Sequence, residues 1–151
     1  MTETINAEIQ AQVRQRVRTL FRAENGPNEN IDENYIAPPH NTAEGIRSIV
    51  DGILANDYLP IVRGKGQVDR DREDTLKKIS AGSPGFVRHV ELADIRIDLF
   101  LDNRLAIVRS LLPCTDSRNG PPVDVSYRNM QVFLHSDAVW QCIAWQVTRI
   151  E

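Results

Sequence analysis

The spacing of apolar residues changes once along this chain, at Ser83-Pro84-Gly85. Before this point they recur at intervals of three and four, which is the period of an amphipathic helix. After it they alternate with polar residues, which is the period of a strand with one buried face. A chain with helices first and strands later is typical of an α+β domain. We therefore expect helices packed on one face of a bent antiparallel sheet.

The first half predicts a long helix followed by a long loop. Residues 5–23 place their apolar side chains on one stripe of a helix. The residues Glu-Asn-Gly-Pro at 24–27 break this helix, and residues 24–42 are predicted to be a loop around Ala37-Pro38-Pro39. Loops of this length are uncommon in compact domains and are often functional or mobile.

Two shorter helices and a short strand complete the first half. Each helix has a polar residue in front of it that is able to cap its free backbone amides. Glycines between the strand and the last helix permit a tight turn. The first of these helices is expected to begin at Asn41 or Thr42, and Asn41 with Glu44 has the spacing of a capping box. The strand is predicted at Tyr58–Arg63 and the turn at Gly64 and Gly66, and the last helix is capped by Asp69 or Asp71.

The second half predicts four long antiparallel strands. Residues 86–101 alternate, but their apolar positions change parity between Leu92 and Ile95. A slip of one residue turns apolar side chains to the wrong face, so we expect a β-bulge near Ala93-Asp94. The other strands are predicted at 104–115, 124–135 and 138–150, with hairpin turns at Asp102-Asn103 and Ser136-Asp137 and a loop at 117–122.

Composition argues against several classes of function. A chain of 151 residues with 41% hydrophobic and 26% charged residues fits one domain, residues 1–151. The net charge of −3 argues against a nucleic-acid partner, because phosphate binding needs a basic patch. No apolar run spans a bilayer, and the first residues lack the apolar core of a secretory signal. Cys114 and Cys142 form neither a disulfide framework nor a zinc site, so we expect reduced thiols in a cytoplasmic protein.

Three segments together resemble a known family. DYLPIVRGKGQVDRDREDTLKKI, VELADIRIDLFLDNRLAIVRS and YRNMQVFLHSDAVWQCIAWQVTRI are similar to the nuclear transport factor 2-like superfamily, and more narrowly to its SnoaL-like branch. That branch commonly ends in a hairpin of the form F-V-x-x-D-G-x-W-x-x-x-A-W-Q-x-T. The matching residues here are Phe133, Leu134, Asp137, Trp140, Ala144, Trp145, Gln146 and Thr148, while Ala138 replaces the turn glycine and 24–42 is an insertion.

The resemblance implies a cone, in which a strongly curved sheet wraps the first helix and leaves an apolar cavity at the wide end. The convex outer face of such a sheet commonly forms a homodimer. The last strand is apolar on both alternating sets through Val147, so we expect it to be central and buried on both faces. We expect Cys142 and Ala144 to face the cone and Trp145 to face a partner subunit, with the reverse assignment as the alternative.

Two residues are candidate catalytic groups. An apolar pocket raises the pKa of a buried carboxyl group towards neutrality, where it serves as acid or base. Asp57 lies where the second helix meets the first strand, close to where isomerase-like relatives carry a catalytic Asp. His89 precedes Glu91 by two residues, and relatives often carry a histidine near this position. The structural alternatives are a helix end for Asp57 and a half-exposed strand position for His89.

Further polar and aromatic residues are candidate ligand-binding groups. A buried arginine needs a partner, for which Asp94, Asp98 or Glu91 are available, whereas an arginine in the cavity would favour a carboxylate ligand. A buried amide either orients a ligand or fixes the strand register, because it needs hydrogen bonds in both cases. The candidates are Tyr58, Arg109, Arg128, Asn129, Trp140 and Gln146.

These features predict a cone protein that binds a small apolar or aromatic molecule, as an isomerase-, dehydratase- or cyclase-like enzyme without a cofactor. The alternative is a non-catalytic homodimer that serves assembly or protein interaction. The sequence has no nucleophile elbow and no HExxH motif, and Gly64-Lys65-Gly66 has the wrong spacing for a P-loop, so no metal or cofactor is expected. Residues 24–42 are expected to form a lid over the mouth of the cone.

Overall fold

Helices occupy the first half of the chain and strands the second, as the apolar spacing predicts. The computed structural model describes residues 2–30, 32–60, 62–63 and 67–150, so the predicted turn at Gly64 and Gly66 lies outside the described residues. The elements are α1 (Thr2–Glu24), α2 (Ala43–Ile53), β1 (Leu54–Pro60), β2 (Val62–Arg63), β3 (Gln67–Val68), α3 (Arg72–Ala81), β4 (Phe86–Arg88), the 3-10 helix η1 (Val90–Leu92), β5 (Asp94–Phe100), β6 (Leu105–Asp116), β7 (Val123–Ser136) and β8 (Val139–Ile150).

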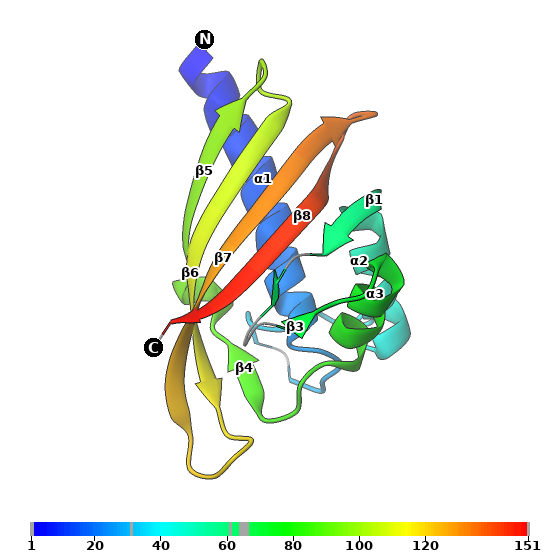
Figure 1. Ribbon diagram of the computed structural model, residues 1–151, viewed down its shortest axis with the longest axis vertical. Coiled ribbons are helices and arrows are strands. Elements are labelled where there is room, and N and C mark those ends of the chain that lie inside the picture. Colours follow the sequence, from blue (N-terminus) through cyan, green and yellow to red (C-terminus); the bar gives the residue numbers. More distant parts are fainter. Residues whose placement is uncertain (1, 31, 61, 64–66, 151) are drawn as a thin grey trace.

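The main sheet has the strand order β1-β8-β7-β6, and both β4 and β5 pair with β6. Neighbouring strands are antiparallel except β1 and β8, which run parallel. The sheet curls across α1, and α2 and α3 lie beside it (Figure 1). The last strand is therefore central, as predicted, because β1 and β7 flank it.

The inner face of the curled sheet packs against α1. Val13, Val17, Leu20 and Phe21 of this helix are fully buried, and their spacing of three and four forms the predicted apolar stripe. Burial of apolar side chains at this seam is the main contribution to the stability of the fold. The predicted helix at 5–23 and its buried face are confirmed.

The structure shows which residue caps each of the two shorter helices, for which the sequence left two choices each. The Thr42 hydroxyl accepts a hydrogen bond from the Gly45 amide (3.0 Å), so Thr42 begins α2. The expected capping box of Asn41 and Glu44 is wrong, because the Asn41 side chain instead donates to the carbonyl of Asn28 (2.6 Å). At α3 the capping residue is Asp71.

The predicted single strand over 86–101 is interrupted. A turn of 3-10 helix at Val90–Leu92 separates β4 from β5, and both strands pair with β6. The apolar positions change parity because residues 90–92 form this turn and do not pair with β6. The expected β-bulge at Ala93-Asp94 is therefore wrong. Val90 in this turn is fully buried, so the apolar side chain stays in the core although the strand does not continue.

The expected direction of Trp145 is also wrong. Its indole is fully buried against Phe21 of α1, with ring centroids 6.4 Å apart. Cys142 is buried on the same inner face, as expected, whereas Ala144, which was expected beside it, is half-buried on the outer face. The register explains the difference, because Val132 pairs with Ala144 while Phe133 pairs with Cys142, which leaves one extra residue in β8. This bulge changes the parity and turns Cys142 and Trp145 to the same side.

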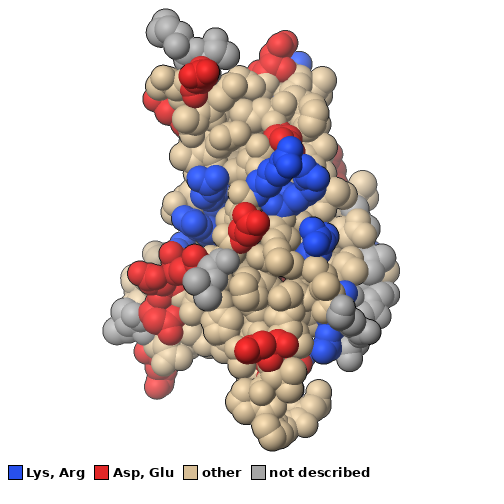
Figure 2. All heavy atoms as spheres, turned by 90° about the vertical axis from the view of Figure 1, so that its left-hand side faces the viewer, with Lys and Arg blue, Asp and Glu red and all other residues tan. Residues whose placement is uncertain are grey.

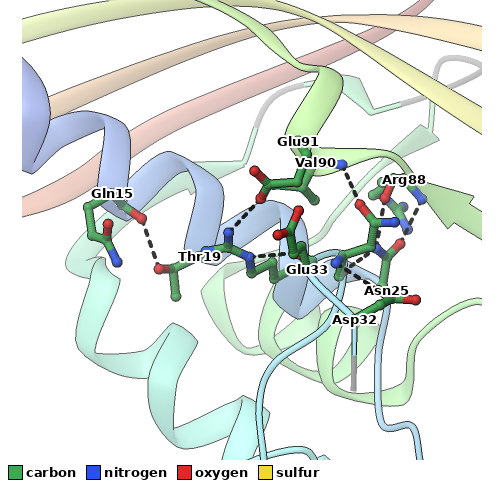
Figure 3. Close-up of polar contacts among 10 residues, drawn as sticks. Gln15, Thr19, Asn25, Asp32, Glu33, Arg88, Val90 and Glu91 are labelled. Carbon is green, nitrogen blue, oxygen red and sulfur yellow. Dashed lines mark hydrogen bonds and ion pairs between the residues drawn. The ribbon is translucent and has the colours of Figure 1, made fainter. Parts of the chain in front are cut away.

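The loop at 24–42 is fixed to the body of the protein (Figure 3). Asn25 is only 8% exposed, and its side-chain amide donates to the carbonyls of Asn34 (2.6 Å) and Arg88 (3.0 Å). Its side-chain oxygen accepts from the Arg88 amide (2.8 Å). Arg22 of α1 pairs with Glu91 (2.8 Å) beside the loop. These bonds hold the loop against the end of α1 and the β4–η1 corner.

Candidate functional site

A cavity of about 380 Å³ lies between α3, β4, the end of α1 and the inner face of β6–β8. Its volume is within the range of small-molecule sites, about 300–1,000 Å³. Ile79, Phe86, Leu112 and Val147 supply its apolar walls. Its polar lining includes Glu24, Asp69, Lys78, Arg88, Arg118 and Asn129. The wall is therefore about half polar, which differs from the apolar cavity with few polar groups that the cone architecture implies.

Each basic side chain that lines the cavity has an acidic partner. The pairs are Arg88 Nε with Glu24 Oε1 (3.5 Å), Lys78 Nζ with Asp69 Oδ1 (2.8 Å) and Arg118 Nε with Asp116 Oδ1 (2.9 Å). The hydrogen bond to Asp69 raises the pKa of Lys78, so the ammonium stays charged. Hydrogen bonds from Arg118 hold the pKa of Asp116 at about 2. The charges of the cavity are therefore balanced within the protein.

Asn129 differs from these groups. It is 1% exposed, and its side-chain oxygen accepts a hydrogen bond from the Trp145 indole (2.9 Å). This bond fixes which side of the amide faces Trp145. The Asn129 Nδ2 group makes no hydrogen bond to any described residue. It is a buried donor in the cavity wall, and buried donors are rarely left unpaired.

Cys114 also lines the cavity. Burial raises the pKa of its thiol to about 12, with the charge of Glu24 as a smaller cause in the same direction. The reactive form of a cysteine is the thiolate, so Cys114 is an inert, neutral part of the wall near pH 7. Cys142 lies deeper, and burial raises its pKa as well.

Neither predicted catalytic residue lies at this cavity. Asp57 is exposed on β1. His89 is half-buried at the end of β4, where its Nε2 atom is hydrogen-bonded to the Thr115 hydroxyl (2.7 Å). Their predicted roles stay predictions, because neither residue lines the cavity.

Among the described residues that line the cavity, Asn129 is the only predicted ligand-binding residue. Trp140 and Tyr58 are buried in the core, 4% exposed each. Arg109 is exposed and pairs with Asp98 (3.1 Å), which is the structural pairing that we considered. Arg128 is exposed and Gln146 half-buried on the outer face of the sheet.

Sequence reasoning missed most of the polar lining. Arg88 lies next to the candidate His89, and it faces inward because it shares the parity of the buried Phe86. Glu24 is the last residue of α1, and a charged residue at a helix end gives no signal in the sequence that it lines a cavity. No described residue between 25 and 42 lines the cavity. The expected role of the loop as a lid stays a prediction.

The architecture has clear counterparts among solved structures. A candidate dehydratase of the NTF2-like family from Streptomyces avermitilis is 13% identical, with a TM-score of 0.67 over 96% of this chain and 99% of that chain. A ketosteroid isomerase-like protein from Erwinia carotovora is 13% identical, with a TM-score of 0.60 over 96% and 95%. The CaMKII hub homology domain from Chlamydomonas reinhardtii is 14% identical, with a TM-score of 0.60 over 94% and 98%.

The chain has the nuclear transport factor 2-like (NTF2-like) fold. This confirms the curled-sheet α+β architecture expected from the resemblance. No family model and no curated protein matches the chain. The narrower likeness to the SnoaL-like branch stays a prediction. Among the described helices, none has the length and hydrophobicity that crossing a membrane requires.

Proposed function

We propose that this NTF2-like protein binds a small, neutral molecule with an apolar or aromatic body in the cavity beside Asn129. The observation that carries the proposal is the unpaired Nδ2 donor of Asn129, whose neighbours in the cavity wall include Leu112, Tyr127 and Val147. A ligand oxygen that accepts this hydrogen bond removes the cost of burying the donor alone. The ligand therefore carries a carbonyl or hydroxyl oxygen at one end.

The charge balance of the cavity favours a neutral ligand over a carboxylate. Arg88, Lys78 and Arg118 each face a carboxylate of the protein within 4 Å. A negatively charged ligand would have to compete with these internal partners and would lose its hydration on entry. A neutral molecule leaves every pair intact.

Calorimetric titration with two probes tests this proposal. We expect the neutral ketone 2-acetonaphthone to bind more tightly than the anion 2-naphthoate. The N129D variant keeps the oxygen that accepts from Trp145 and replaces the Nδ2 donor, so it is expected to bind the ketone at least about 10-fold more weakly. N56D, at an exposed position of β1, is the matched control. Tighter binding of 2-naphthoate, or unchanged binding by N129D, would contradict the proposal.

Proton transfer beside a carbonyl is the chemistry that this cavity supports best. The Glu24 carboxylate lines the same cavity and is 5% exposed, so it is the candidate base. It would take a proton from the carbon next to the carbonyl, while the electron pair moves to the oxygen that Asn129 binds. The candidate dehydratase and the isomerase-like protein of the same fold are consistent with this class.

Hydrogen exchange of the ketone in D2O tests the catalytic part. The methyl protons of 2-acetonaphthone are expected to exchange faster with the protein than with buffer alone. E24Q removes the base and is expected to return the rate to that of buffer while the ketone still binds. An exchange rate with wild-type protein equal to that of buffer would limit the function to binding.

Self-association is a second candidate function. The outer faces of β6, β7 and β8 carry an apolar patch, which we call the outer patch. Three of its residues are large and 37–39% exposed, and others are half-buried. The outer patch consists of Leu105, Ile107, Leu111, Met130, Val132, Leu134 and Ala144. The hub homology domain with the same fold supports an assembly role for such a surface.

A further inference from the structure

Two more buried polar side chains lie on the inner face of the sheet, next in line after residues that line the cavity. Along β6 the inward residue after Leu112 is Ser110, and along β7 the one after Asn129 is Gln131. Ser110 is 5% exposed and Gln131 is 0% exposed. On β8 the inward residue next to Val147 is Trp145. None of these three residues lines the cavity, and they follow its lining residues Leu112, Asn129 and Val147 along the inner face of the sheet.

The side chains of Ser110, Asn129 and Gln131 lie close together. Ser110 and Asn129 are direct register partners, and such pairs have Cβ atoms about 4.5–5.5 Å apart. Gln131 follows Asn129 by two residues on the same face, about 7 Å along the strand. The side chains of Ser110, Asn129 and Gln131 therefore form one polar cluster in an otherwise apolar core.

The cluster has hydrogen-bonding capacity that no described residue uses. The unpaired atoms are Ser110 Oγ, Asn129 Nδ2, and both Oε1 and Nε2 of Gln131. Together they offer donors and at least one acceptor side by side. The surrounding inward positions are apolar, with Val108, Phe133 and Trp145 all fully buried. A chain that needed only a stable core would gain by an apolar residue at position 131.

We propose that this cluster recognises a neutral group that both donates and accepts hydrogen bonds, of the carboxamide or lactam class. This inference rests on the proposed function, because it assigns the polar end of the same ligand. The ligand's carbonyl accepts from Asn129 Nδ2, and its N–H donates to Gln131 Oε1. Ser110 supplies a further donor or acceptor beside them. A ketone satisfies only the first of these contacts.

Two probes of nearly equal size test the inference. 2-Naphthamide and 2-acetonaphthone differ in an amino group against a methyl group. Wild-type protein is expected to bind the amide about 10-fold more tightly than the ketone, since one more buried hydrogen bond is made. Q131M, which keeps the side-chain length, is expected to remove this preference and to leave the affinity for the ketone within about 3-fold.

The outcomes separate the two proposals. Equal binding of both probes by wild-type protein, or a preference that persists in Q131M, would overturn the inference and leave the proposed function standing. Binding of neither probe would overturn both. If Q131M does not fold, S110A removes only a hydroxyl group, and its expected result is a preference reduced about 3-fold. An unchanged preference in S110A would then count against the inference.

Discussion

Gln131 is fully buried among apolar side chains, although its own side chain is a polar amide. Neither atom of its amide is paired with a described residue. An unsatisfied buried polar group costs about 1–3 kcal/mol, so the residue lowers stability in the ligand-free protein. Proteins commonly keep such local conflicts at functional sites.

Replacement of Gln131 by methionine is therefore expected to stabilise the ligand-free protein. The expected gain is at least about 1 kcal/mol, because the change removes unsatisfied polar atoms and nearly conserves volume. Urea unfolding measures it, with F133L on the same inner face as a control that is expected to lose stability. A loss of stability in Q131M would show that the Gln131 amide is fully satisfied in the folded state.

The sequence predicted one residue of the cavity wall, Asn129, and the reason is physical. Asn129 was a candidate because a buried amide in a strand needs hydrogen-bond partners. Glu24 and Arg88 give no such signal, because charged residues at a helix end or in a short strand are ordinary surface features. Only the fold turns both inward, where they pair with each other. Charge pairing between distant segments is not encoded in local spacing.

At the scale of elements, the end of α3 is shaped by a contact between two glycines. Gly82 ends the helix with φ +72° and ψ −173°, a region that is essentially open to glycine alone. A Cβ atom on Gly82 would lie 2.9 Å from the Cα atom of Gly26. Gly82 also lines the cavity, so this contact sets the position of one cavity wall.

Two glycine-to-alanine variants are expected to have opposite effects. G82A should lower the free energy of unfolding by at least about 1 kcal/mol, because of backbone strain and the contact with Gly26. G52A, in α2 with no atom within 4 Å of its added methyl group, should raise it by up to about 1 kcal/mol through helix propensity. Chemical denaturation of both variants measures the difference. Similar values for the two would contradict the role given to Gly82.

The spacing of apolar residues predicted which segments are helices and strands better than it predicted the breaks and bulges within the strands. The three helices and the hairpins of β6, β7 and β8 are where the sequence predicts them, because their periodicity is long and regular. The break at η1 and the bulge in β8 were not predicted correctly. Both change strand parity, and a parity change has several structural solutions that differ only in tertiary contacts. For that reason Trp145 was assigned to the wrong face.

At the scale of the whole molecule, the outer patch and the charged residues among its apolar ones suggest how two copies meet. Figure 2 shows the side of the molecule on which β5 lies, with basic side chains gathered near its middle and one acidic group among them. Arg96 of β5 and Arg109 of β6 both pair with Asp98 of β5, at 3.5 and 3.1 Å. The apolar residues of the outer patch continue from β6 to β8, so a second copy would pack over these three strands.

Met130 lies near the centre of the outer patch and tests this arrangement. Wild-type protein is expected to be a dimer at micromolar concentration, and M130D to be a monomer with an unchanged fold, because the change buries a carboxylate in the interface. Sedimentation velocity and circular dichroism measure the two properties. Q12E, which adds the same charge at an exposed position of α1, is the control. A wild-type monomer, or a dimer that survives in M130D, would contradict the dimer proposal.

The central claim is that a neutral ligand binds in the cavity at Asn129, and the most direct measurement is an NMR titration of 15N-labelled protein with 2-acetonaphthone. The side-chain amide signals of Asn129, assigned by their absence in N129D, are expected to shift, together with backbone signals of residues that line the cavity. Signals of the outer patch are expected to stay in place. Unchanged Asn129 signals at saturating ketone, or shifts confined to the outer patch, would contradict the claim.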